Sequence, residues 1–171
     1  MKILLLSDTH RILRNVKEIF QNLSDSVEMV IHLGDCYDDM EGFVEQYNHL
    51  TFHQVLGNCD FNVGKKKEDI IIVNNRKILL THGSSQDVKY GYDELVEYAQ
   101  QKEVDICLFG HTHYPIIQKF GELLLMNPGS TSLPRGVSSP GYGILDISED
   151  GQVAASIVGK FKNIYRTVEV V

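Results

Sequence analysis

Residues 105–113 read DICLFGHTH, an apolar run that ends in a glycine and in two histidines separated by one threonine. A short apolar run between a charged residue and a glycine is typical of a buried strand. A strand that ends in His111 and His113 brings two imidazole rings to one point of the fold. The side chains that follow the other strands therefore decide what this point can bind.

Before this stretch, apolar runs alternate with segments of helical spacing. Short apolar runs predict strands at 2–6, 29–34, 51–57, 69–73 and 77–82. Apolar residues three and four apart predict helices at 13–23, 38–47 and 90–102. The opening strand–helix–strand unit implies parallel strands joined by a right-handed crossover.

After Tyr114 the pattern changes to short apolar runs separated by glycines and turn residues. These runs lie at 115–120, 122–127, 141–147, 152–158 and 165–171. They are typical of antiparallel strands and hairpins. Together with the alternating first part, they predict an α/β (α+β) fold, a four-layer αββα sandwich of two mixed sheets. Without a linker or low-complexity tract, residues 1–171 are expected to form a single domain.

The composition argues against several classes of function. Sixteen basic and 23 acidic side chains give a formal net charge of −7, which argues against a broad face for long nucleic acids. The three cysteines are widely spaced, so neither a disulfide framework nor a thiolate zinc site is expected. No segment approaches the ~20 apolar residues of a membrane span, and the first apolar run is too short for a signal peptide. We therefore expect a cytoplasmic protein that does not bind a membrane.

Side chains that can bind a metal follow five of the predicted strands. They are Asp8, His10, Asp35, Asn58, His82, His111 and His113. The carboxyl ends of parallel strands point to one edge of a sheet, so these side chains are expected to converge. Imidazole nitrogens with carboxylate or amide oxygens suit Mn²⁺, Fe²⁺, Ni²⁺, Co²⁺ or Zn²⁺. Seven ligands exceed the need of one tetrahedral ion, which predicts two ions that share a carboxylate.

Strand alternation offers a reason for the spacing of these residues. Residues two apart in an extended chain point to the same side, so the pairs at 8–10 and 111–113 would each face one cavity if the chain stays extended. The glycines at 34, 57 and 110 are expected to let the backbone pass close to the ions. Among the remaining histidines, only His32 is expected to support a ligand, because it lies near Asp35 in the sequence.

The five blocks resemble the signature blocks of the calcineurin-like metallophosphoesterases in order and approximate spacing. They are Asp8-Thr9-His10, Gly34-Asp35, Gly57-Asn58, His82 and Gly110-His111-Thr112-His113. Residues 127–135, NPGSTSLPR, resemble a segment of the small YfcE-type phosphodiesterases. The resemblance implies the αββα fold and a dinuclear centre bridged by Asp35. One ion would be held by Asp8, His10 and His113, and the other by Asn58, His82 and His111.

The resemblance also implies a phosphodiesterase whose dimetal-bound hydroxide attacks phosphorus in line, without a covalent intermediate. The expected substrate is a small phosphodiester or nucleotide-like molecule, and manganese is the expected metal. Asp35, Asn58 and Asp60 are the expected catalytic residues. Asn58 and Arg135 are expected to contact the substrate, as is the loop at 127–132, because a guanidinium suits phosphate oxygens. The alternative for Arg135 is a surface arginine in a polar turn.

One position departs from the family pattern. Many members carry a histidine after the Gly-Asn pair, where it stabilises the transition state or protonates the leaving group. Here Cys59 takes that position and Asp60 follows it. A thiol cannot replace the histidine as a cation, so we expect a preference for esters with good leaving groups. Whether Cys59 or Asp60 assists the leaving group stays open.

The alternative function is an interaction scaffold with weak or no catalysis, because a retromer subunit shares this fold and uses its surface. The complete set of ligands favours the enzyme, since a scaffold does not need them. The sequence leaves open the physiological substrate, the native metal and the preference for monoesters or diesters. It also leaves open the oligomeric state, although the β-rich C-terminal part offers an edge for a homo-oligomer.

Overall fold

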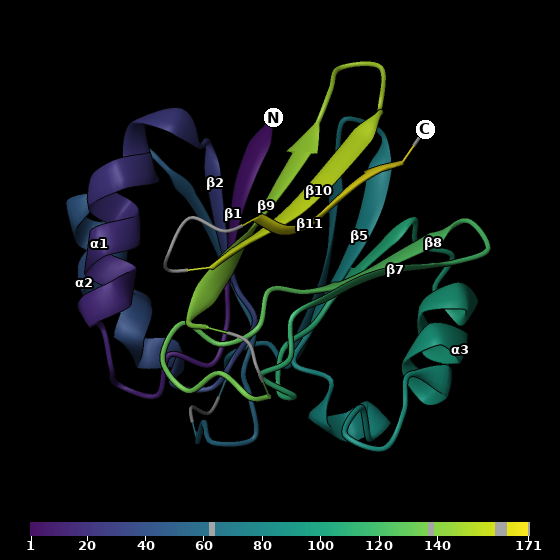
Figure 1. Ribbon diagram of the computed structural model, residues 1–171, viewed down its shortest axis with the longest axis horizontal. Helices are drawn as coiled ribbons and strands as arrows, with labels where there is room; N and C mark the ends of the chain where they lie inside the picture. The colour runs from purple at the N-terminus through teal and green to yellow at the C-terminus, as the bar shows by residue number, and fades with distance from the viewer. Residues whose placement is uncertain (62–63, 137–138, 160–163, 171) are drawn as a thin grey trace.

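The computed structural model describes residues 1–61, 64–136, 139–159 and 164–170, and the side chains up to residue 159 (Figure 1). The helices are α1 (Arg14–Leu23), α2 (Glu41–Gln46) and α3 (Asp93–Gln101). The first strands are β1 (Lys2–Leu6), β2 (Met29–His32), β3 (Thr51–Gln54), β4 (Glu68–Val73), β5 (Arg76–Thr81) and β6 (Ile106–Leu108). The later strands are β7 (Ile116–Phe120), β8 (Leu123–Asn127), β9 (Gly141–Ile147), β10 (Val153–Gly159) and β11 (Ile164–Val170).

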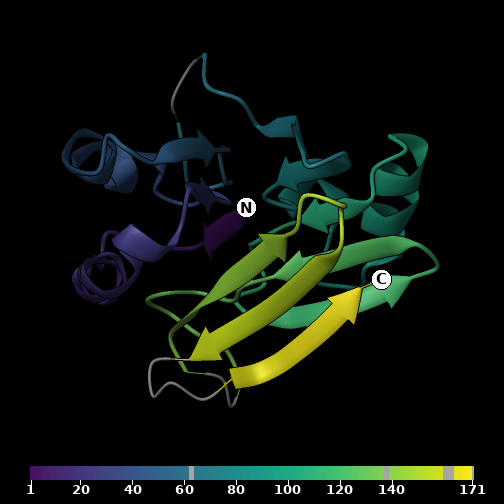
Figure 2. The ribbon, with the colours of Figure 1, turned by 90° about the horizontal axis from the view of Figure 1, so that it is seen from above.

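The strands form two mixed sheets. The six-stranded sheet has the order β11-β10-β9-β1-β2-β3, and the five-stranded sheet has the order β4-β5-β6-β8-β7. Strands β1, β2 and β3 are parallel, whereas β9 runs antiparallel to β1. Figure 2 shows β9, β10 and β11 side by side at one end of the six-stranded sheet.

Alternating side chains of the strands build three hydrophobic layers. Leu5 of β1 packs between the two sheets with Leu80 and Leu108 of the other sheet. Leu4 and Leu6 of β1 point to the opposite face, where they pack against α1 and α2. Helix α3 covers the outer face of the five-stranded sheet through a third cluster, and Figure 1 shows it on the side away from α1 and α2. The predicted four-layer αββα sandwich is therefore confirmed.

Two predictions about strands need correction. The strand predicted at 51–57 ends at Gln54, because the chain leaves the sheet there and the amide of Leu56 bonds to the carbonyl of Lys66. The C-terminal strands are not all antiparallel, since β8 pairs in parallel with β6. All five residues of β8 are buried, as expected for a central strand with a covered sheet on both faces.

The carboxyl ends of β1, β2, β3, β5 and β6 lead into loops at one end of the molecule, at the bottom of Figure 1. Parallel pairing within each sheet puts the ends of β1, β2 and β3 at one edge, and those of β5 and β6 at one edge of the other sheet. Within each sheet the predicted convergence is thus a result of the strand order, and the packing of the two sheets on a common core brings the two edges together. Among the described residues, no helix is long and apolar enough to cross a membrane.

Candidate metal centre

Left-handed backbone recurs in the loops after β1, β2 and β6. The residues with positive φ there include Asp8 (φ 53°), His10 (φ 46°), Asp35 (φ 60°), His111 (φ 67°) and His113 (φ 61°). Such φ values are uncommon for residues other than glycine and cost of order 1–3 kcal/mol each. The chain at 8–10 and 111–113 is therefore not extended, so the condition for strand alternation is not met there, and tight turns bring each pair together. Strain collects where the candidate ligands lie.

Glycines permit the close approach of these loops. A Cβ atom on Gly57 would collide with the carboxylate of Asp35, and one on Gly110 would collide with the hydroxyl of Ser7. The same Cβ on Gly110 would lie 3.0 Å from Oδ2 of Asp8. Gly57 and Gly110 therefore let the backbone pass close to Asp35, Ser7 and Asp8, and their closeness to the ions stays a prediction.

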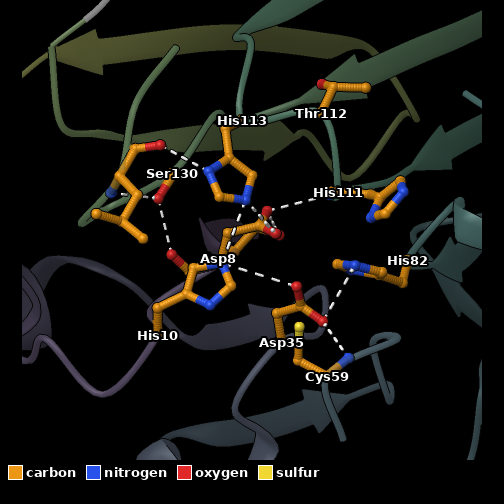
Figure 3. Close-up of polar contacts among 12 residues, drawn as sticks. Asp8, His10, Asp35, Cys59, His82, His111, Thr112, His113 and Ser130 are labelled. Atoms are coloured by element: carbon orange, nitrogen blue, oxygen red, sulfur yellow. Dashed lines mark hydrogen bonds and ion pairs between the residues drawn. The ribbon is translucent and has the colours of Figure 1, made fainter. Parts of the chain in front are cut away.

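One group of ligand atoms lies between the loops after β1, β2 and β6. Asp8, His10, Asp35 and His113 each offer an atom, and these atoms lie within 4.8 Å of one another. The Nε2 atoms of His10 and His113 are 3.2 Å apart, and Nε2 of His113 lies 3.2 Å from Oδ1 of Asp8. Figure 3 shows these side chains pointing toward a common centre.

A second group shares Asp35 with the first. Asp35, His82 and His111 offer atoms within 4.8 Å of one another. Nε2 of His82 lies 3.3 Å from Oδ1 of Asp35 and 3.2 Å from Oδ1 of Asn58. All seven ligands expected from the sequence are therefore brought together, with Asp35 in the middle.

Backbone carbonyls orient two of the imidazole rings. Nδ1 of His113 donates to the carbonyl of Leu133 at 2.6 Å, and Nδ1 of His82 donates to the carbonyl of Leu33 at 2.7 Å. A carbonyl can only accept, so Nδ1 carries the proton and the lone pair of Nε2 faces the cluster. Metal-binding histidines in proteins are held in this way by the other ring nitrogen.

Asp8 provides a direct test of whether a metal fits. Its Oδ2 accepts hydrogen bonds from Ser7 Oγ at 2.6 Å and from the amide of His111 at 3.1 Å. Its Oδ1 is buried without a hydrogen-bond partner and lies 3.2 Å from Nε2 of His113. A buried carboxylate oxygen beside the lone pair of an imidazole is costly unless a cation joins them. The donor set of the first group thus fits a divalent ion.

The two carboxylates are held in their charged form. Burial raises the pKa of Asp35, but the ion pair with His82 and the amide of Cys59, whose nitrogen lies 2.9 Å from Oδ1, lower it well below its usual range. Burial also raises the pKa of Asp8, and the imidazoles of His113 and His82 bring it below its usual range. Both residues are therefore negatively charged at neutral pH.

The imidazoles respond to these charges. Burial lowers the pKa of His82 and of His113, but Asp35 and Asp8 outweigh it, and both pKa values end above their usual range. The cluster thus attracts positive charge. The pKa of His111 is instead lowered to about 4 by burial and by the charges of His82 and Lys89. Lys89 thus adds positive charge to the surroundings of His111, an effect that no motif of the sequence predicts.

Asp60 lies beside the cluster and binds the backbone. Its Oδ1 accepts from the amide of Tyr37 at 2.8 Å, and its Oδ2 accepts from the amide of Gly57 at 2.7 Å. These bonds join the loop after β2 to the loop after β3. Cys59 is exposed, and burial of part of its thiol together with the Asp35 charge raises its pKa to about 11. The thiol is therefore uncharged at neutral pH.

The segment 127–135 supports the cluster from the side of β8. Ser130 Oγ donates to the carbonyl of Asp8 at 2.7 Å, and Asn127 Nδ2 donates to the carbonyl of Gly110 at 2.7 Å. Both side chains are buried, and contact between this loop and substrate stays a prediction. Arg135 is exposed, and its amide donates to the carbonyl of His113 at 3.3 Å. The sequence missed the bracing role of these polar side chains because a polar loop pattern does not show which way they point.

His32 supports the cluster indirectly. It is fully buried, and its Nε2 lies 3.3 Å from the hydroxyl of Thr9, which donates to Oδ2 of Asp39 at 2.6 Å. Thr9 stands between two ligands in the first loop. The expected support by His32 therefore passes through Thr9, and not through a bond to Asp35.

His32 should make the fold sensitive to acid. Burial lowers its pKa to about 4, below the ordinary 6.5. Between these values the unfolded chain binds a proton that the folded chain does not, so stability present above pH 6.5 is lost as the pH falls. Between pH 7.5 and pH 5, wild type should lose about 2 kcal/mol more unfolding free energy than His32→Gln. Urea unfolding at both pH values measures this, and equal losses in the two proteins would contradict it.

Comparison with known proteins agrees with this geometry. The sequence model described as "Calcineurin-like phosphoesterase superfamily domain" matches residues 1–150. The probable metallophosphoesterase YsnB of Bacillus subtilis is 31% identical over 151 residues, covering 88% of this chain and 86% of YsnB. Phosphodiesterase YfcE of Escherichia coli is 28% identical over 169 residues, covering 85% of this chain and 88% of YfcE. The structure of Vps29 from Entamoeba histolytica with Zn²⁺ covers 100% of both chains at 23% identity and a TM-score of 0.80, a likeness of fold alone.

Proposed function

The chain belongs to the calcineurin-like phosphoesterase superfamily, and from this premise we propose that it is a phosphodiesterase with a centre of two divalent ions. The observation that carries the proposal is the position of Asp35, whose carboxylate belongs to both groups of ligand atoms. A carboxylate with two oxygens suits a bridge between two cations. Small phosphodiesters, including nucleotide-like ones, are the proposed substrates.

Each residue has a distinct part in this proposal. Asp8, His10 and His113 would hold one ion, Asn58, His82 and His111 would hold the other, and Asp35 would contribute to both sites. When bound, the ions would supply an activated water molecule and neutralise phosphoryl oxygens during in-line displacement. The Asn58 amide is exposed beside His82, so its Nδ2 can donate to a substrate oxygen while Oδ1 faces the ion.

Two residues act at the edge of the reaction. Arg135 carries its charge close enough to His113 to affect the pKa of that ring, which supports a contact between its guanidinium and substrate phosphate. Asp60 is better placed to position the loops of Asp35 and Asn58 than to exchange protons, because backbone amides occupy both of its oxygens.

Three further parts of the proposal rest on chemistry. Manganese is the proposed metal because the ligands mix imidazole with carboxylate and amide oxygens. A cytoplasmic location is proposed because all three cysteines are free thiols. Residues 1–171 are proposed to act as one domain, since a single cluster contains core side chains of both sheets.

A scaffold with this fold is the second candidate, and the likeness to Vps29 favours it in fold alone. The buried Oδ1 of Asp8 favours the enzyme. In a scaffold without metal, this oxygen would stay without a hydrogen bond and would destabilise the fold without serving a function. The ordered rings of His82 and His113 point to the same conclusion.

Hydrolysis of bis-p-nitrophenyl phosphate beside p-nitrophenyl phosphate tests the proposal. Chelator-stripped protein should be inactive, and Mn²⁺, Ni²⁺, Zn²⁺ or Mg²⁺ should be added back one at a time while bound metal is counted. We expect two ions per chain, restored diesterase activity and the highest rate with Mn²⁺. Protein that binds metal but turns over neither ester with any ion would favour the scaffold.

The thiol of Cys59 should limit the range of leaving groups. An uncharged thiol cannot supply the positive charge that a histidine would place near a departing oxygen, so alkyl esters should react far more slowly than aryl esters. Cys59→His should raise kcat for methyl esters by about 10²-fold and leave p-nitrophenyl release nearly unchanged. Cys59→Ser is the matched control and should leave both rates unchanged. Wild-type protein that cleaves both classes at similar rates would contradict this prediction.

A further inference from the structure

Three exposed apolar side chains belong to the loops that carry or orient His10 and His113. Among the described residues, Ile12, Tyr114 and Leu133 are 45%, 48% and 47% exposed. Ile12 lies two residues after His10, and Tyr114 directly follows His113. The carbonyl of Leu133 accepts the Nδ1 proton of His113 at 2.6 Å. Exposed apolar side chains at the loops of a candidate site can form a binding surface, and we call these three residues the apolar rim.

Hydrogen bonds hold the loops of the apolar rim together. Ser132 Oγ donates to the carbonyl of Asp8 at 2.9 Å, and Asn15 Nδ2 donates to the carbonyl of Thr131 at 2.7 Å. These bonds tie the loop that carries Leu133 to the loop that carries Ile12. The rim is therefore fixed in place, and does not need to be ordered by a ligand.

The ring of Tyr114 is supported by backbone. A Cβ atom on Gly136 would lie 2.6 Å from Cε1 of Tyr114, so the ring rests directly against this glycine. Gly136 has a φ of 67°, a conformation that glycine adopts without strain. An aromatic ring that is packed on one side and exposed on the other offers a flat surface for stacking.

We propose that Tyr114, helped by Leu133 and Ile12 from the neighbouring loops, binds a planar aromatic group on the ester that stays attached to phosphorus. This inference rests on the proposed function and narrows its substrates to aryl or nucleoside phosphodiesters. The aromatic group would lie next to the ion held by Asp8, His10 and His113. Every planar aromatic group has a face that can stack on a tyrosine ring, so phenyl and nucleobase groups can both bind there.

Three diesters with the same p-nitrophenolate leaving group test the inference: the methyl, phenyl and thymidine-5′ esters. For Tyr114→Ala, the kcat/KM ratio of the phenyl or thymidine ester over the methyl ester should fall about tenfold, mainly through KM. Tyr114→Phe should keep the wild-type ratio. A fall for both aromatic esters supports a general aryl site, and a fall for the thymidine ester alone supports a nucleobase site. An unchanged ratio for both would overturn the inference.

A second pair of variants moves the ring without removing it. The methyl group of Gly136→Ala would displace Tyr114, so the same ratio should fall. Gly121→Ala is the matched control, because Gly121 also has a positive φ (62°) but has open space around it. Equal ratios in the two variants would count against the inference. Failure of wild type to cleave any of the esters with any ion would instead refute the proposed function.

Discussion

Asp35→Asn should abolish the metal-dependent hydrolysis of phosphodiesters while the fold survives. The substitution keeps the shape of the side chain and an oxygen for the amide of Cys59, which lies 2.9 Å from Oδ1. It removes the negative charge that both groups of ligand atoms share. Loss of a bridging charge costs several kcal/mol of transition-state stabilisation, so kcat/KM should fall by at least about 10³-fold. Bound manganese should fall from two ions per chain to one or none.

The measurement combines bis-p-nitrophenyl phosphate turnover, metal analysis and a thermal melt of the same sample. Asp69→Asn is the matched control, because Asp69 also faces an imidazole, with His53 Nδ1 3.8 Å from its Oδ2, but lies outside the cluster. The control should keep activity and metal content. An Asp35→Asn protein that keeps both two ions and its turnover would show that the bridge is elsewhere.

The sequence predicted that the candidate ligands converge because each one lies at the end of an apolar run, and runs of this kind are easily recognised. Parallel pairing of β1 with β2, and of β5 with β6, then forces their ends together without any detailed knowledge of packing. Asp8 and His113, 105 residues apart by number, follow strands of different sheets, so their contact also needs the two sheets to pack face to face with these strand ends on the same side.

The local geometry could not be predicted in the same way. Asp8, His10, His111 and His113 are left-handed, which the sequence pattern gave no reason to expect of residues other than glycine. The hydrogen bonds that stabilise these conformations come from distant segments, such as the bond from Ser130 Oγ to the carbonyl of Asp8. Sequence periodicity contains no information about such bonds. The parallel pairing of β8 with β6 was missed for a related reason. A short apolar run indicates a buried strand, but it does not indicate whether the neighbouring strand is parallel or antiparallel.

Gly110→Ala should both destabilise the protein and disable the centre. The new methyl group would collide with Ser7 Oγ and would lie 3.0 Å from Oδ2 of Asp8, and both atoms belong to buried side chains. Neither can move into solvent, so the loops after β1 and β6 must separate. Such overpacking typically costs about 1–3 kcal/mol, and a displacement of about 1 Å in a catalytic group can cost about 10²-fold in rate.

The comparison with Gly42→Ala separates this collision from a general effect of replacing glycine. Gly42 lies in α2 with open space around it, so alanine there should stabilise the helix by about 0.5–1 kcal/mol and leave turnover unchanged. Urea unfolding and diester hydrolysis of both variants make the test. If Gly110→Ala retained wild-type stability and rate, the side chains of Ser7 and Asp8 would have to move aside without loss of unfolding free energy or of activity. The strained loop conformations would then be incidental to the centre, because they hold Asp8 in position only if its surroundings are rigid.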